Sequence, residues 1–402
     1  MALTPLPAAL DSLFQQVPSA PTSEHEALSQ CLWRVLAEPI VAGIDVPGFD
    51  NSAMDGYAVR AAELPGPLPV SQRIPAGVAP RPLERGSVAR IFTGAVLPEG
   101  ADTVVMQEDV LDKDGQLTLL GSITEGQHIR RRAADICSGA EILPAGRVLT
   151  PQDIGLAASV GCATLPVRRP LRVAVLATGD ELATPGEHRE DWQIYNSNAA
   201  QIGAQITAMG MQAVSFSSLP DDPLIIGDAL ERAAAQVDCI ITCGGVSVGE
   251  EDHVRGQIEA RGTLTLWKLA IKPGKPLAFG QVAGCPVFGL PGNPVAAWTT
   301  FALVVRPWLA KAQGANLPNP RRLQVRADFE VNRAGSREEY LRVNVLEGQP
   351  RVAQKTPDQS SGVLSGVCQA QGLAVIPIGV TVRRGDLVDV ILMTELLSPL
   401  VA

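Results

Sequence analysis

The chain has 402 residues, of which 46% are hydrophobic and 19% are charged, and its formal net charge is −9. This length favours two to four domains, and the acidity argues against a nucleic-acid-binding protein. Seven cysteines without a Cys-x-x-Cys pair, no basic leader and no run of about 20 apolar residues exclude a disulfide framework, a structural zinc site, a signal peptide and a membrane span, so we expect a soluble cytoplasmic protein.

The first part of the chain is expected to hold a helical domain interrupted by a β-rich module. A Ser-x-x-Glu capping box followed by apolar residues at helical spacing predicts a helix over residues 23–38. Residues 46–135 turn often and alternate, which predicts an inserted β-rich module. A short helix follows over residues 153–160. We therefore expect residues 1–45 and 136–168 to form one helical or linker domain around the insertion.

Two polar clusters lie within the expected module. Two carboxylates, Asp50 and Asp55, fall within six residues of each other, just before a strand-like segment. Short polar residues of this kind cap or turn a chain, and the alternative is a carboxylate loop that contacts a metal or a polar ligand. Three consecutive arginines at positions 130–132 precede Asp135. Such a run is usually a solvated surface, although it also suits an anion.

Residues 169–318 alternate strand and helix, which predicts a doubly wound, mostly parallel α/β sheet. The expected strands cover residues 171–177, 214–219, 237–243, 264–269 and 286–290. The expected helices follow caps at Asn198 and Asp222 and run to about residues 209 and 236, and a third covers 294–312. Residues 319–402 alternate at period two, which predicts a small β-barrel or sandwich.

A polar or glycine-rich loop follows each expected strand of the α/β domain. The loops cover residues 178–182, 221–222, 244–252, 272–276 and 291–294. Carboxyl ends of parallel strands meet at one edge of a sheet, and ligands bind beyond that edge. One site therefore explains these loops together, whereas a purely structural explanation needs five independent turns.

The residue types in these loops suit a phosphate and a divalent cation. Three glycines would offer backbone N–H groups to a phosphate: Gly244, Gly245 and Gly292. The start of the helix at Pro294 would offer further N–H groups. Lysines supply positive charge, and these are Lys268, Lys272 and Lys275. Carboxylates are ligands for Mg²⁺, and these are Glu181, Asp222 and Asp252.

The residues by themselves predict a Mg²⁺-dependent enzyme that acts on a phosphorylated small molecule. No Walker A motif and no GxGxxG motif occurs, which disfavours P-loop and standard dinucleotide folds. For residues 244–252 alone, the alternative is a tight turn with an acidic helix cap.

Several motifs, in order, resemble those of the molybdopterin molybdenumtransferases, the family of bacterial MoeA and of the E domain of gephyrin. They are Asp50 to Val59 (DNSAMDGYAV), Phe92 to Ala95 (FTGA), Pro98 to Asp109 (PEGADTVVMQED), Thr178 to Leu182 (TGDEL), Asn196 to Asn198 (NSN), Gly244 to Asp252 (GGVSVGEED), Lys272 to Pro276 (KPGKP) and Gly289 to Pro294 (GLPGNP). The resemblance covers nearly the whole chain.

The resemblance implies an enzyme that inserts molybdate into the dithiolene of adenylylated molybdopterin, with Mg²⁺, and releases AMP. It also implies a homodimer in which the Asp55 loop of one subunit faces the α/β domain of the other, with molybdopterin adenylyltransferase and apo-molybdoenzymes as further partners. By position, the implied catalytic residues are Asp55, Thr93, Asp135, Glu181, Asp222, Asp252, Lys268 and Lys272. The implied substrate-binding residues are Gly244, Gly245, Ser247, Lys275, Pro291, Gly292, Pro294, Arg342 and Ser361.

The sequence departs from the family pattern at two neighbouring positions, and three rival functions are considered. Ala133 and Ala134 stand where the family has Gly-Glu before the residue that Asp135 matches. The rivals are a related adenylyltransferase, which lacks the Asp55 module and the β tail, a scaffold without chemistry, as in the use of gephyrin at synapses, and a nucleotide-hydrolysing relative.

Overall fold

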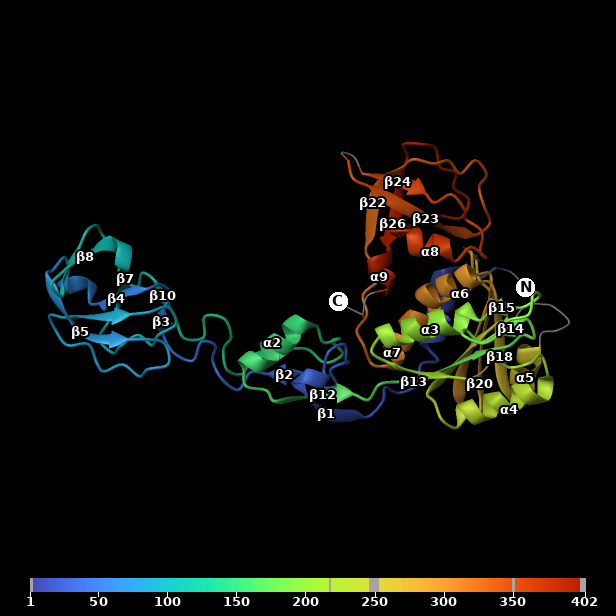
Figure 1. Cartoon of the computed structure of the whole chain (residues 1–402), viewed down its shortest axis with the longest axis horizontal. Coiled ribbons are helices and arrows are strands. Elements are labelled where there is room, and N and C mark those ends of the chain that lie inside the picture. The colour runs from blue at the N-terminus through green and yellow to red at the C-terminus, as the bar shows by residue number, and fades with distance from the viewer. Residues whose placement is uncertain (1–2, 217, 246–252, 349–350, 398–402) are drawn as a thin grey trace. The chain divides into compact units, whose positions relative to one another are not determined.

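The computed structural model describes residues 3–216, 218–245, 253–348 and 351–397. The chain divides into two compact units (Figure 1). The main unit comprises Met1–Glu38, Ala145–Pro151 and Thr164–Ala402, and the inserted unit comprises Pro39–Pro144 and Gln152–Ala163. The finer division into four domains stays a prediction. Ser247 and Asp252 lie outside the described residues.

The centre of the main unit is a mixed sheet of six strands in the order β16-β13-β17-β21-β20-β18. In that order, the strands are Gln212–Ser215, Arg172–Ala177, Cys239–Cys243, Cys285–Leu290, Pro276–Val282 and Gly262–Lys268. The first four run parallel, whereas β20 is antiparallel to both β21 and β18. Two reversals give β18 the direction of β21, so the loop after β18 lies at the same edge as the loops after the parallel strands. The mostly parallel α/β sheet is therefore confirmed.

Strand β20 was not expected from the sequence. It forms a hairpin with β21 in which Ala283 and Gly284, at the turn, have positive φ values of 49° and 81°. Two left-handed residues match the twist of a hairpin, and glycine supplies one of them without a Cβ clash.

Helices pack on both faces of this sheet, as a doubly wound fold requires. Val173 and Val175 share one buried cluster with residues of α3, α6 and α7, whereas Ala174 shares a second cluster with α4 and α5. This alternation follows from the period of two along a strand. The helices are α3 (Ser197–Ala208), α4 (Pro223–Ala234), α5 (His253–Arg261), α6 (Pro294–Thr300) and α7 (Arg306–Ala312). A π-helical segment, Phe301–Val305, joins α6 to α7 within the helix expected over residues 294–312.

Two expected helix starts have different outcomes. Asp222 caps α4 as expected, because its Oδ1 accepts hydrogen bonds from the N–H groups of Leu224 and Ile225 at 2.8 and 3.1 Å. The cap expected at Asn198 is wrong. Asn196 caps α3, and its Oδ1 accepts from the N–H of Ala199 at 3.1 Å.

The helix expected over residues 23–38 is wrong. Residues Ser23–Ala27 form β1, which pairs antiparallel with β12 (Thr164–Arg168), and only a short 3₁₀ turn, Leu28–Gln30, follows. Alternate residues of β1 are exposed, so the segment follows a period of two. Further along, the N–H of Leu36 donates to the carbonyl of Arg147 at 2.8 Å. Pairing with a distant segment overrides the local capping signal.

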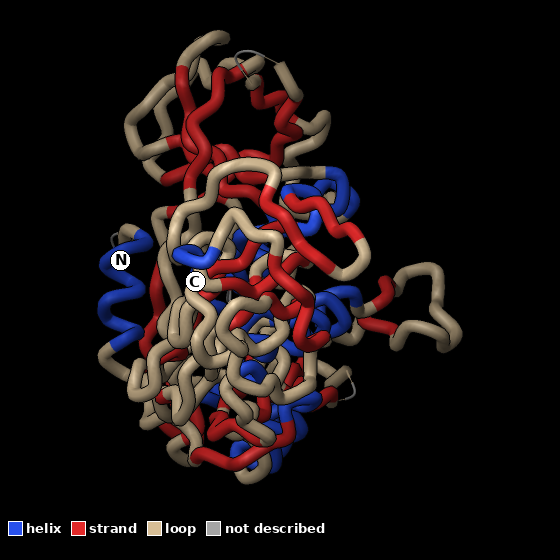
Figure 2. Tube along the Cα trace, turned by 90° about the vertical axis from the view of Figure 1, so that its left-hand side faces the viewer, coloured by secondary structure: helices blue, strands red, loops and turns tan. Residues whose placement is uncertain are grey.

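An unexpected helix, α1 (Leu6–Phe14), lies near the amino terminus, beside the N marker in Figure 2. It packs on α7, where the indole N–H of Trp308 donates to the carbonyl of Leu13 at 3.1 Å. Both residues belong to the largest buried cluster of the main unit.

The carboxyl-terminal region is a closed barrel of five strands, which confirms the expectation of a small barrel or sandwich. The strands are β22 (Arg322–Ala327), β23 (Glu338–Leu346), β24 (Val352–Lys355), β25 (Gly372–Ile376) and β26 (Leu387–Leu392). The order β23-β24-β22-β26-β25 closes because β25 also pairs with β23. Short helices α8 (Ser365–Gln369) and α9 (Met393–Leu397) flank it. Strand β19 (Ile271–Lys272), in the loop after β18, pairs with β23 and so joins the barrel to the sheet edge.

The inserted unit is β-rich, as expected. Its main sheet has the order β7-β4-β6-β5-β9-β8. In that order, the strands are Thr103–Met106, Gly56–Val59, Val88–Ile91, Leu68–Ile74, Gln116–Leu119 and Val110–Lys113. Smaller ladders pair β3 (Asn51–Ser52) with β10 (Ile129–Arg130) and β2 (Ile40–Val41) with β11 (Glu141–Leu143). The expected short helix is α2, Pro151–Ser159, and 3₁₀ turns cover Ala61–Glu63 and Gln107–Asp109. Among the described residues, every helix is too short or too polar to cross a lipid bilayer.

Candidate active site

A pocket of about 340 Å³ lies beyond the carboxyl ends of the parallel strands of the main unit. Its lining residues come from the loops after β13, β16, β17 and β21 and from the start of β20. They are Thr178, Gly179, Glu181, Asp221, Gly244, Gly245, Pro276, Pro291, Gly292 and Asn293. The structure thus brings together parts of all five polar loops at one sheet edge.

Glycines line this pocket because their backbone leaves no room for a side chain. Gly245 has a φ of +68°, and a Cβ there would lie 2.4 Å from Cγ2 of Val254. Gly179 has a φ of +146°, and a Cβ there would lie 2.3 Å from Oε2 of Glu181. Across the pocket, a Cβ on Gly292 would lie 3.9 Å from Cα of Gly244. The loops after β17 and β21 are therefore in contact, and backbone rather than side chains meets whatever enters.

Not every glycine offers a free donor. The N–H of Gly244 donates to the carbonyl of Leu290 at 3.1 Å, which continues the pairing of β17 with β21. At the start of α6, Pro294 has no N–H, and the N–H of Val295 donates to the carbonyl of Ser361 at 3.0 Å. The expectation of several free donors at this helix end is therefore wrong for these positions.

Two carboxylates line the pocket, whereas three were expected for the metal, of which Asp252 lies outside the described residues. Glu181 is present as expected, whereas the second is Asp221 rather than Asp222. Asp221 is linked to Asp180, since its N–H donates to Oδ1 of Asp180 at 3.2 Å and its Oδ2 accepts from the N–H of Asp180 at 3.4 Å. Asp222, one residue on, caps α4. The doubled acid was visible in the sequence, but which member enters the pocket depends on where the helix begins.

The lysines of the loop after β18 are half to fully exposed. Nζ of Lys272 lies 3.0 Å from Oε1 of Glu339 on β23, and the Lys272 side chain is 54% exposed. An ion pair this exposed contributes only about 0.2–1 kcal/mol, so exchanging Glu339 for a phosphate or an oxyanion costs little. Lys275 is exposed and Lys268 half-buried, and their carbonyls accept from the N–H groups of Leu269 and Thr4. Sequence reasoning missed Glu339, which lies 67 residues from its partner.

Arg342 is buried, with 1% of its surface exposed, and it holds the loop that contains Ser361. Its Nη2 donates to the carbonyls of Asp358 and Ser360 at 2.8 and 3.0 Å. Burial lowers the pKa of this guanidinium. Ser361 in turn accepts from Val295 of α6, so Arg342 supports the helix start beside the pocket through this loop.

Side chains of α3 hold the loop after β21 from the other side. Nδ2 of Asn198 donates to the carbonyl of Gly292 at 2.7 Å, and Nε2 of Gln201 donates to the carbonyl of Pro294 at 3.2 Å. Asn198 belongs to the Asn-Ser-Asn motif noted in the sequence, whereas Gln201 gave no signal. These bonds keep Pro291 and Gly292 at the pocket wall.

In the inserted unit, Asp55 and Thr93 form one hydrogen-bonded pair. Oδ1 of Asp55 accepts from the N–H and the hydroxyl of Thr93 at 2.8 and 2.7 Å. These two bonds, the backbone one first, lower the pKa of Asp55. The nearby guanidinium of Arg90 donates to the carbonyl of Gly56 at 2.9 Å. Asp135 has an exposed side chain, and its N–H donates to the carbonyl of Val46 at 3.0 Å.

Replacing Thr93 by alanine is expected to raise the pKa of Asp55 towards its ordinary value, because the hydroxyl donor to the ionised carboxylate is lost. The remaining N–H keeps part of the effect. The lowered pKa contributes stability that is present above the unfolded pKa and disappears as the pH falls through the folded pKa. T93A should therefore reduce this contribution at neutral pH, and its difference from the wild type should vanish as the pH falls below the folded pKa. Carboxyl ¹³C titration measures the shift, and T93S should restore it. An unchanged Asp55 titration in T93A would contradict this assignment.

A metal site is only partly defined by the described residues. Within them, no group of three or more His, Cys, Asp or Glu side chains is placed to hold a metal ion. Glu181 and Asp221 line the same pocket, and Mg²⁺ commonly uses one or two carboxylates together with substrate phosphate and water. The donor set of the pocket therefore fits Mg²⁺.

Together, these features define the class of the main unit. A mixed α/β sheet with a glycine-lined, carboxylate-edged pocket beyond its strand ends is the arrangement of an α/β domain for a small phosphorylated ligand.

Comparison with known families and proteins narrows this class. Residues 4–161 match the family model described as MoeA N-terminal region (domain I and II), residues 174–311 match a probable molybdopterin binding domain, and residues 324–393 match the MoeA C-terminal region (domain IV). A Haemophilus influenzae protein named molybdopterin molybdenumtransferase is 41% identical over 316 residues, which cover 77% of this chain and 78% of that one. A Nostoc protein of the same name is 36% identical over 400 residues, covering 94% and 92%. The crystal structure of a molybdopterin biosynthesis MoeA protein from Pyrococcus horikoshii, 29% identical, superposes with a TM-score of 0.83 over 97% of this chain and 100% of that one.

The chain therefore belongs to the molybdopterin molybdenumtransferase family, an enzyme family of molybdenum cofactor biosynthesis.

Proposed function

We propose that the chain catalyses the Mg²⁺-dependent insertion of molybdate into the dithiolene of adenylylated molybdopterin, with release of AMP. One observation carries the proposal beyond the family assignment. Glu181 and Asp221 line the same small pocket as Gly245 and Gly292, so carboxylates stand beside a backbone surface that admits a phosphate. Carboxylates next to a phosphate site would repel the ligand unless a cation lies between them.

The glycine wall would receive a phosphate group of the substrate. Gly245 and Gly292 carry no side chain, so phosphate oxygens can approach the backbone closely. Asn198 fixes Gly292 through its carbonyl, which keeps this wall in place before the ligand arrives. Fixing the wall in advance reduces the ordering cost of binding.

Mg²⁺ would be held by Glu181 and Asp221 together with substrate oxygens. When bound there, it would supply positive charge to the phosphate anhydride and so favour cleavage that releases AMP. Asp252 and Asp222 remain predicted members of the metal side. Asp222 can serve there only through an oxygen that its capping bonds to α4 leave free, because its Oδ1 accepts from Leu224 and Ile225.

Positive side chains of the loop after β18 would hold the anionic reactants. Lys272 reaches Glu339 in the free protein and would turn to phosphate or molybdate when either binds. Lys268 and Lys275 would add charge on either side. A point charge on a flexible stem suits an oxyanion that is held and then transferred. Pro291 and Pro294 would shape the wall, and Arg342 would support it through the loop in which Ser361 accepts the N–H of Val295.

The proposal includes a homodimer in the cytoplasm, in which Asp55 of one subunit serves the site of the other. The Asp55–Thr93 pair supports it, because an ionised carboxylate held by two donors on an exposed loop is suited to meet a polar group of another molecule. Molybdopterin adenylyltransferase would supply the substrate, and apo-molybdoenzymes would receive the product.

The test is AMP release from adenylylated molybdopterin by the full chain, followed by chromatography. We expect release that requires both molybdate and Mg²⁺, and removing Mg²⁺ with a chelator should lower the rate at least about 100-fold, since the cation supplies most of the charge neutralisation at the anhydride. Restoring Mg²⁺ should restore the rate.

The same assay separates the rival functions. Release of AMP that is indifferent to molybdate would favour a nucleotide-hydrolysing protein. ATP-dependent attachment of AMP to molybdopterin would favour an adenylyltransferase, and a chain without any turnover would favour a scaffold.

A further inference from the structure

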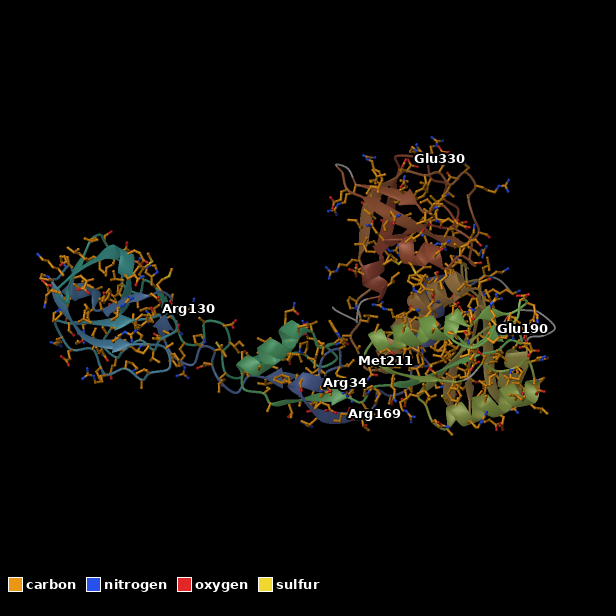
Figure 3. All side chains as sticks on the ribbon, viewed as in Figure 1. Arg34, Arg130, Arg169, Glu190, Met211 and Glu330 are labelled. Carbon is orange, nitrogen blue, oxygen red and sulfur yellow. The ribbon has the colours of Figure 1, made fainter. Side chains whose placement is uncertain are left out.

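The segment that follows Glu181 leaves the pocket and returns to it as a short ribbon. Strand β14 (Leu182–Ala183) pairs parallel with β15 (Ile194–Tyr195). The N–H of Ile194 donates to the carbonyl of Glu181 at 2.8 Å, and Nε2 of Gln193 donates to the carbonyl of Asp180 at 3.1 Å. The returning end of this loop is therefore attached directly to the residues that line the pocket, and Figure 3 labels Glu190 on its outer part.

This returning end exposes large apolar side chains. Trp192 is 65% exposed, Ile194 58% and Tyr195 47%. On the neighbouring segment, which the Asp180–Asp221 bonds join to the loop, Leu224 at the start of α4 is 76% exposed. Several exposed apolar residues on segments that are bonded to the residues of a polar pocket indicate a ligand or partner surface more strongly than a single exposed residue does.

The loop that carries Trp192 is braced by its own side chains. The guanidinium of Arg189 donates to the carbonyls of Gln193 and Glu190, the latter at 3.1 Å, and it lies 6.0 Å from the ring centroid of Tyr195. The hydroxyl of Tyr195 donates to the carbonyl of Glu187 at 3.2 Å. These bonds order the loop in the free protein, so less conformational entropy is lost when a ligand binds.

The size of the pocket indicates what this surface meets. Small-molecule sites usually occupy roughly 300–1,000 Å³, and the pocket of about 340 Å³ lies at the small end. It can hold a phosphate and its immediate surroundings, but not also the two planar ring systems of the substrate in the proposed function. The rings must then lie outside the pocket, and the apolar loop borders it.

We propose that Trp192, with Ile194 beside it, stacks against a planar heteroaromatic ring of the substrate whose phosphate lies in the glycine-lined pocket. The inference rests on the proposed function for the identity of that substrate. An indole offers a large flat face at low entropic cost, and stacking on an aromatic side chain tolerates any ring of suitable size. Trp192 thus supplies affinity for a planar ring over a ligand without one, whereas Glu181 and the glycines act on the phosphate.

The test compares ligands with and without a ring on the full-length chain. AMP and a monophosphorylated pterin carry the two candidate rings, and ribose 5-phosphate carries none. We expect Trp192→Ala to weaken binding of AMP, of the pterin, or of both by roughly tenfold, because stacking on an aromatic side chain contributes about that factor or more per ring. Binding of ribose 5-phosphate should be unchanged. The probe that loses affinity identifies the ring.

Trp192→Phe is the matched variant, because phenylalanine keeps a flat aromatic face at the same position. It should retain most of the affinity that W192A loses. Quenching of indole fluorescence by the bound ring should be present in the wild type and strongly reduced in W192F. A merely structural role for Trp192 would not produce this quenching.

Several results would overturn the proposal. Equal binding of all probes by the wild type and W192A would show that no ring reaches Trp192. Equal affinity of the wild type for AMP, pterin and ribose 5-phosphate would show that the ring contributes nothing. A change of oligomeric state in W192A, with unchanged probe affinities, would assign the surface to an interface between copies. Failure of AMP release from adenylylated molybdopterin, by contrast, would refute the proposed function and leave ring-dependent binding at Trp192 measurable.

Discussion

Asp221→Asn is expected to lower the rate of AMP release by about 100-fold or more. Asparagine keeps the size of the side chain and its place at the pocket, but it removes the negative charge that would hold Mg²⁺ against the substrate. Loss of one preorganised charged or hydrogen-bonding group at a reacting centre costs about 10²–10³ in rate. The Mg²⁺ concentration that gives the half-maximal rate should rise as well, because the substitution weakens binding of the cation and leaves the contacts to the phosphate unchanged.

Two neighbouring substitutions make this prediction sharp. Asp228→Asn changes an exposed acid on α4 that pairs with Arg232 at 3.7 Å, and it should leave the rate unchanged. Asp222→Asn should keep α4 capped, since asparagine caps a helix about as well as aspartate. If D222N abolished AMP release and D221N did not, the metal would belong to Asp222, and the assignment to Asp221 would be wrong.

The α/β core was predictable because its signals are local and agree with one another. Cys239 to Cys243 are all buried, as their apolar character indicates for a central parallel strand. Asp222 and Pro223 mark the start of α4 by capping chemistry that needs no tertiary information. Loops at the carboxyl ends of such strands share an edge by geometry, so the position of the pocket followed from the order of strands and helices.

The error over residues 23–38 arose because distant pairing decides the structure there. Ser23 and Glu26 have the spacing of a capping box, yet the segment forms β1 because β12, about 140 residues away, offers a partner edge. Strand β20 was missed for a different reason, since it directly follows the lysine-rich loop and only its hairpin partner β21 was expected as a strand. Period and capping patterns report on one segment at a time, whereas sheet pairing depends on two.

The site shows the same limit at the level of single residues. The paired acids at 221 and 222 were visible, but only the folded backbone shows that one caps a helix and the other lines the pocket. Lys272 looked like a free cation, yet it pairs with Glu339 of the barrel. Arg342 matched a substrate-binding position of the family, whereas in this structure its guanidinium is buried and bonds the backbone. These contacts join the barrel to the sheet edge, which no local pattern encodes.

Arg342→Ala is therefore expected to destabilise the main unit by about 2–4 kcal/mol, because it removes two hydrogen bonds that hold the loop of Ser361 and opens a cavity where a buried side chain lay. The loop that Arg342 holds accepts the N–H of Val295 through Ser361. Hydrogen exchange at the Val295 amide should accelerate at least about tenfold in R342A, as expected for a loss of local stability of 1.4 kcal/mol or more. AMP release should fall in parallel, since the start of α6 beside the pocket wall loses its support.

The matched control is Arg326→Ala on β22, where an exposed arginine donates to the single carbonyl of Gly385 at 2.8 Å. It should change stability by less than about 0.5 kcal/mol, as surface substitutions usually do, and leave the Val295 amide unaffected. Arg342→Lys keeps a charge but reaches fewer carbonyls, so it should fall between the wild type and R342A in exchange rate. Lost activity in R342A with unchanged exchange at Val295 would instead show that Arg342 acts on the substrate directly. The contact of the barrel with the sheet edge would then matter for chemistry alone, and not for holding the pocket wall.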